Sequence, residues 1–128
     1  SRYDIQQVVS YRVVIGRVTE ERGHAVAFLE AHASQPFAIS VISVTEFLEG
    51  FARSVEGERL IRNFAHLQIT SSIAREAARL RRGLRESGML IGDFDILIAA
   101  TALVESLPLV TRNEGHFGRV PGLELVLY

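Results

Sequence analysis

Short apolar segments alternate with longer amphipathic segments along this chain, and no other feature limits its fold as strongly. Residues 37–42 and 109–111 have the composition and length of buried strands. Helical periodicity marks residues 71–86 and 94–104, between those strands. Strands separated by helices of this length form parallel sheets that helices cover on both faces. We therefore expect an α/β fold, a three-layer α/β/α sandwich with a central, mostly parallel sheet.

Cap residues and chain-breaking residues indicate where the other elements lie. The sequence predicts helices at 19–33 and 44–54, a short helix after Gly57, and strands at 67–70 and 123–127, the last at the sheet edge. Ser71 or Ser72 caps the long helix, and Gly88 closes it. Residues 8–14 suit either a strand end or a short buried helix.

Length and composition indicate a single domain spanning residues 1–128. Hydrophobic residues make up 48% and charged residues 23% of the chain, the balance of a globular protein. No apolar run reaches the roughly 18 residues of a membrane span, and the first residues do not resemble a signal peptide. Cysteine is absent, which excludes disulfides and thiolate chemistry. We expect a cytoplasmic protein without a membrane association.

The net charge of -1 provides no overall attraction for polyanions, so a nucleic-acid contact would need a local basic patch. All 14 basic residues are arginine, a bias that suits phosphate binding but that a G- and C-rich genome also produces. Arg75, Arg79 and Arg82 share one face of the predicted long helix. They suit RNA phosphates, although Glu76 and Glu86 nearby equally indicate an ordinary solvated face.

Asp93 and Asp95 begin a predicted apolar helix and point about 200° apart, so they cannot share a face. On the structural interpretation Asp93 is the N-cap and Asp95 is a first-turn acid favoured by the helix dipole. On the functional interpretation Asp95 is a metal ligand. An apolar stretch follows Asp95 directly, which places this acid at the margin of the core.

Two more polar groups occur where predicted strands end. Ser43 and Glu46 have the spacing of a capping box, yet a carboxylate one turn into a helix also points into the cleft of an α/β fold. Asn113 follows the strand 109–111, where it either starts a turn or contributes a third polar group to the cleft.

Together these segments resemble the PIN domains, especially VapC-like and FitB-like toxins, over residues 37–125. The segments that carry the resemblance are Val41 to Gly50 with the acid at Glu46, Asp95 to Leu103, Leu109 to Asn113, Phe117, and Val120 to Leu123. The N-terminus departs from the family pattern of an apolar strand followed by Asp-Thr-Asn. Aligning Val8-Val9-Ser10 puts Ile5, rather than Asp4, in the place of the first aspartate.

The resemblance implies a ribonuclease that depends on Mg²⁺, with Mn²⁺ as a substitute, and that is the toxin of a type II toxin-antitoxin system. It implies that Asp4, Glu46 and Asp95 bind the metal and that Asn113 completes the catalytic group. Thr111 and Arg112 would help to bind the RNA backbone. An antitoxin and a second copy of the chain would be the protein partners.

Two other interpretations remain open. The first is a catalytically degenerate PIN-like domain that acts as an RNA-binding or protein-interaction module, which the N-terminal departure favours. The second is an unrelated α/β phosphotransfer domain. No general-base histidine is required, because a hard cation supplies both the hydroxide and the charge stabilisation that phosphodiester hydrolysis needs. We interpret His116 as a structural residue.

Overall fold

The strands form one parallel sheet in the computed structural model, which describes residues 7–9, 27, 37–62, 64–111 and 114–127. Along the sheet their order is β3-β2-β1-β4-β5, and every neighbouring pair is parallel, as the sequence predicts. The strands are β1 (Gln7–Val9), β2 (Phe37–Ser40), β3 (Ala65–Leu67), β4 (Leu109–Thr111) and β5 (Leu125–Leu127). The last strand lies at an edge of the sheet, which confirms that prediction.

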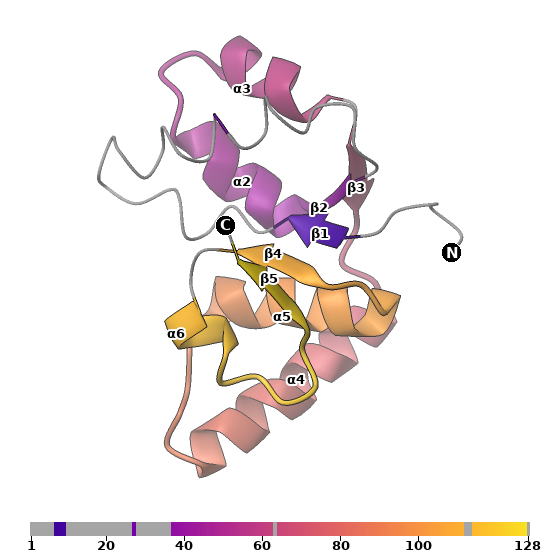
Figure 1. Ribbon diagram of the computed structural model, residues 1–128, viewed down its shortest axis with the longest axis vertical. Helices are drawn as coiled ribbons and strands as arrows, with labels where there is room; N and C mark the ends of the chain where they lie inside the picture. The colour runs from indigo at the N-terminus through magenta and orange to yellow at the C-terminus, as the bar shows by residue number, and fades with distance from the viewer. Residues whose placement is uncertain (1–6, 10–26, 28–36, 63, 112–113, 128) are drawn as a thin grey trace.

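Helices connect these strands in the pattern that parallel pairing requires. They are α2 (Val41–Glu49), α3 (Ser54–Ile61), α4 (Ser71–Glu86), α5 (Asp93–Glu105) and α6 (Glu114–Phe117). Figure 1 shows α2 and α3 in the upper part of the view, and α4 and α5 in the lower part. None of the helices in the described part of the chain has the length and apolar character needed to cross a bilayer.

Strand β2 separates two hydrophobic clusters because successive side chains of a strand point to opposite faces. Phe37 and Ile39 pack with Phe47 of α2 and Ile61 of α3, in what we call the small cluster. Ala38 points the other way and joins the large cluster, which α4 and α5 dominate. Both faces of β2 are therefore covered by helices.

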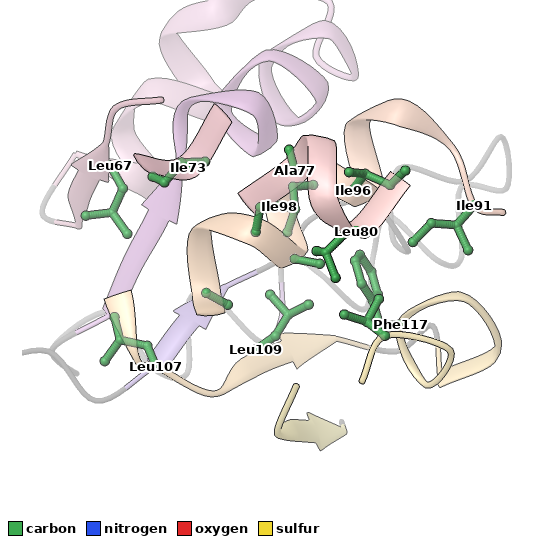
Figure 2. Packing of buried hydrophobic residues seen from close by; sticks show 14 of the residues in the cluster. Leu67, Ile73, Ala77, Leu80, Ile91, Ile96, Ile98, Leu107, Leu109 and Phe117 are labelled. Atoms are coloured by element: carbon green, nitrogen blue, oxygen red, sulfur yellow. The ribbon is translucent and has the colours of Figure 1, made fainter. Parts of the chain in front are cut away.

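The large cluster brings α4, α5, β4 and α6 together (Figure 2). Its side chains include Leu80 of α4, Ile98 of α5, Leu109 of β4 and Phe117 of α6, each exposed by 3% or less. Burying an aliphatic or aromatic side chain of this size contributes about 1.5–3 kcal/mol. On α5 the small residues Ala99, Ala100 and Ala102 are all fully buried, which allows the close packing that the sequence predicts.

Two helices begin earlier than the sequence predicts, because a different residue caps each of them. Helix α2 starts at Val41, and its cap is Ser40, whose hydroxyl accepts a hydrogen bond from the Ile42 N–H. Thr70 caps α4 through the Ile73 N–H, so neither Ser71 nor Ser72 is the cap. Since Thr70 has this role, β3 ends at Leu67 and does not reach residue 70.

Glycines mark two further boundaries. Gly88 has a φ of 69° and closes α4, as predicted, with the Met89 N–H donating to the Leu84 carbonyl at 2.8 Å. Gly57 lies inside α3 and does not precede it, which corrects the predicted boundary. A Cβ at Gly57 would lie 2.9 Å from the Leu48 side chain and 3.0 Å from the Phe51 ring, so these side chains would have to shift to accept a larger residue.

Candidate active site

Asp95 lies in the first turn of α5 and is completely buried. The amide groups at a helix N-terminus favour a negative charge there, which offsets part of the cost of removing a carboxylate from water. Asp93, two residues earlier, points to solvent, with 72% of its side chain exposed. The prediction that the two acids face different ways is confirmed. Asp93 is not the N-cap, however, because α5 is capped at Gly92.

His116 of α6 contacts Asp95 directly, with its Nδ1 atom 2.9 Å from the Asp95 Oδ2 atom. The other side of the imidazole reaches the surface, since 43% of the His116 side chain is exposed. This contact holds the buried carboxylate at one of its oxygen atoms and links α5 to α6. His116 thus has a contact with a predicted site residue that the sequence did not indicate.

Glu46 lies on α2 and is 3% exposed. Ser43, Glu46 and Phe47 share one face of the helix by their spacing, and all three are buried. Ser43 lies inside the helix and is not its N-cap, so the predicted capping box between Ser43 and Glu46 is wrong. Glu46 is therefore a buried acid in the middle of a helix.

Parallel pairing places these helices at a common edge of the sheet. β1 lies between β2 and β4, so the carboxyl ends of the three strands meet at the same edge. Helix α2 begins directly after β2, and α6 begins three residues after β4. Helix α5 contacts both α2 and α6. The edge where an α/β fold binds ligands thus carries the helices of Glu46, Asp95 and His116.

Of the other predicted site residues, the structure describes only Thr111. Thr111, the last residue of β4, is fully buried at this edge. Asp4, Arg112 and Asn113 lie outside the described residues. Within the ranges that the structure describes, no group of three or more His, Cys, Asp or Glu side chains is arranged to hold a metal ion. Of the three predicted metal ligands, the structure describes Glu46 and Asp95.

The donor chemistry of the two buried acids suits a hard divalent cation. Carboxylate oxygens are the ligands that Mg²⁺ prefers, and this ion usually takes only one or two of them, with water completing its octahedral shell. Arg81 pairs with the exposed Asp93, at 2.9 Å between Nε and Oδ1, whereas Asp95 contacts the His116 imidazole. Glu46 and Asp95 therefore fit the kind of cofactor that the resemblance implies.

The family model for the PIN domain matches residues 13–123 of this chain. Ribonuclease VapC1 of Methanocaldococcus jannaschii is 35% identical over 95 residues, which cover 71% of this chain and 69% of the relative. Helix α5, β4 and the segment after β4 lie within the matched region, and so do α2 and Glu46. The chain belongs to the PIN domain family.

Solved structures share its fold. DNA-bound VapBC from Salmonella typhimurium superposes with a TM-score of 0.73, at 20% identity, over 96% of this chain and 98% of that chain. A toxin-antitoxin complex from Klebsiella pneumoniae gives a TM-score of 0.63 at 25% identity, over 94% of this chain and 96% of that chain. The parallel sheet and its helices are thus arranged as in these proteins.

Proposed function

We propose that this chain is a Mg²⁺-dependent endoribonuclease and the toxin of a type II toxin-antitoxin system. The observation that carries the proposal is the burial of two acids, Glu46 and Asp95, on helices that contact each other at the ligand-binding edge of the sheet. Membership of the PIN domain family and a relative named as a ribonuclease support the same activity.

Each predicted site residue has a part in the proposed site. Glu46 and Asp95 hold the cation, directly or through water, together with Asp4 if that residue reaches the site. The bound ion supplies a hydroxide at neutral pH and positive charge for the phosphate oxygens. His116 fixes the orientation of Asp95 through the contact between Nδ1 and Oδ2. Asn113 orients water or the phosphate, and Thr111 and Arg112 contact the RNA backbone.

The proposed partners are an antitoxin that covers this edge and a second copy of the chain. The Klebsiella complex that shares the fold supports the antitoxin. We also propose that the complete domain, residues 1–128, is a three-layer α/β/α sandwich located in the cytoplasm. The two clusters on opposite faces of β2 support the layered arrangement.

A catalytically degenerate PIN domain is the second candidate. One feature of the sequence favours it, because Ile5 occupies the place of the first aspartate of the family pattern. Such a protein would keep the fold and an RNA or protein interaction without turnover. Cleavage assays separate the two candidates.

The test compares RNA cleavage by the wild-type chain, Asp95→Asn and Glu46→Gln with Mg²⁺, with Mn²⁺ and with a chelator. We expect each amide variant to lose activity by a factor on the order of 100, typical for the loss of one charge-stabilising group. Asp93→Asn is the matched control, since its carboxylate is exposed and should be dispensable. Cleavage that survives chelation, or that Asp95→Asn leaves undiminished, would exclude this mechanism. A wild-type chain that binds RNA without cleaving it would support the degenerate candidate.

A further inference from the structure

A hollow of about 280 Å³ lies beside the C-terminal half of α4 and does not contain any residue of the candidate active site. One wall is the helix itself, with Arg79, Leu80, Gly83 and Leu84, and the opposite wall includes Arg119 and Pro121 from the segment before β5. Met89, 44% exposed, lies at its margin. The hollow therefore combines an apolar interior with two arginines.

Gly83 keeps the hollow open although packing does not require a glycine there. A Cβ added at Gly83 would meet no described atom within 4 Å, and the backbone at this position is helical. Gly57 in α3 differs, because its Cβ would collide with Leu48. Glycine in a helix interior is less stable than alanine, so Gly83 lowers the stability of α4 without a packing reason. Open space is what this glycine provides.

The charge of the hollow suits a polyanion. Its described lining contains the guanidinium groups of Arg79 and Arg119 and no acidic side chain. A hydrogen bond to Glu76 raises the pKa of Arg79 above its ordinary value, so this group stays cationic. The Arg79 side chain is 61% exposed and that of Glu76 21%, and a surface pair of this kind contributes little to stability, so little energy opposes a second contact from Arg79. Arg79 also continues the face of α4 that carries Arg75 and Arg82.

The hollow is connected to the candidate active site through a short series of contacts. Arg119 donates from Nη1 to the Leu90 carbonyl at 3.3 Å, which ties the two loops at the margin together. The Arg119 N–H donates to the carbonyl of His116, the residue that contacts Asp95. Arg119, which lines the hollow, is thus hydrogen-bonded to the residue that contacts Asp95.

We infer that this hollow, the α4 groove, is an RNA subsite that accommodates one nucleotide of the substrate strand outside the point of cleavage. Leu80, Leu84 and Met89 contact the base, and Arg79 and Arg119 contact its phosphates. Apolar contact with a base and ionic contact with the backbone are how proteins hold single-stranded nucleic acid. The inference rests on the proposed ribonuclease function and names where the substrate is held.

The test uses Gly83→Leu, which fills the groove, and Gly83→Ala, which leaves most of it open. Both substitutions should raise the melting temperature by a few degrees, because both remove glycine from a helix. Only Gly83→Leu should raise KM for a random-sequence single-stranded RNA pool, by about 5- to 10-fold, with kcat unchanged, as expected for lost uniform binding. In the Asp95→Asn background, Gly83→Leu should raise the Kd for the same RNA by a similar factor.

Arg119→Gln tests the phosphate contact, with Arg59→Gln on the exposed surface of α3 as its control. Removing one phosphate contact should reduce the slope of log K against log salt by about 0.7 for a single strand, whereas Gly83→Leu should leave the slope unchanged. If the wild-type chain cleaves RNA and both Gly83→Leu and Arg119→Gln keep full RNA affinity, the inference about the groove is overturned but the proposed function is not. A polyglutamate peptide tests the alternative that the groove binds an acidic protein segment. If both variants keep full RNA affinity and only Gly83→Leu fails to bind this peptide, the groove belongs to an acidic protein segment and the RNA inference is overturned.

If the wild-type chain cleaves no RNA, the proposed function fails. Failure of the groove inference is still distinguishable from failure of the proposed function. The Kd values then decide the inference without any activity. A difference between Gly83→Leu and Gly83→Ala in RNA affinity would support the groove as an RNA contact, and equal affinities would exclude it.

Discussion

The two faces of the sheet are built differently. Among the described residues, the face under α4 and α5 has 16 buried hydrophobic residues in its cluster, most of them aliphatic. The face under α2 and α3 has five, and three of these are phenylalanines. Phe37 and Phe64 of this small cluster pack edge to face, with ring centroids 5.9 Å apart.

The site takes one acid from each face. Asp95 begins the central helix of the large cluster, whereas Glu46 lies on α2 beside Phe47 of the small cluster. The cluster around α5 is larger than the one beside α2, so we expect Asp95 to be held more rigidly than Glu46. Stability and activity should therefore respond differently to changes on the two faces.

The largest expected effect comes from Ile98→Ala in the large cluster, compared with Ile61→Ala in the small one. Both isoleucines are fully buried, so the chemical change is the same. We expect losses in the free energy of unfolding of about 4 kcal/mol for Ile98 and about 2 kcal/mol for Ile61, within the range for such truncations. Ile61 is the last residue of α3 and belongs to a cluster of five buried residues, which should rearrange around the space more easily than a cluster of 16.

Chemical denaturation of both variants, at equal buffer and temperature, measures this difference. Equal losses would show that the two faces are equally rigid and would remove the distinction between them. A change in the m-value would indicate instead that one face unfolds separately from the other.

His116→Ala should have the next largest effect, on activity. Loss of a partner that orients a metal ligand typically lowers activity about 10- to 100-fold. His116→Asn should recover part of the rate, because its amide can donate to Asp95 where Nδ1 does. Both variants are assayed for kcat and for the Mg²⁺ concentration at half-maximal rate. No recovery by asparagine would mean that the imidazole acts in some other way than by positioning Asp95.

Breaking the ion pair between Arg81 and Asp93 should have the smallest effect. Its side chains are 44% and 72% exposed, so solvent screens most of the attraction. A double-mutant cycle with Arg81→Ala and Asp93→Ala should give a coupling energy of no more than about 1 kcal/mol, smaller still at high salt. Coupling well above this value would show that the pair, and not the large cluster, holds α4 against α5.

Sequence patterns predicted the α5 side of the site better than the α2 side. The apolar run after Asp95 and its small residues left one helical register that buries the acid, and the structure has that register. Near Glu46 there are two serines able to cap a helix, Ser40 and Ser43, and local sequence does not rank them. In the structure Ser40 is the cap and Ser43 is buried inside the helix, so the choice between them depends on tertiary packing.

The contact between His116 and Asp95 could not be predicted from the sequence. The two residues are 21 positions apart, and the run Glu114 to Phe117 has no spacing that links it to α5. A polar stretch after a predicted strand was the only available signal. The ion pair of Arg81 with Asp93 was missed for the same reason, since it joins two helices whose relative rotation depends on packing.

The order of the strands has a consequence for the timing of synthesis. β1 is the central strand, and β4, one of its two neighbours, is made by the ribosome about a hundred residues later. A nascent chain that already exposes Glu46 has β2 beside β1 but lacks β4, the other neighbour of β1, and lacks α5 and α6, which carry Asp95 and His116. The candidate site therefore cannot form until α6 has been synthesised, because Asp95 and His116 both follow α4 in the chain.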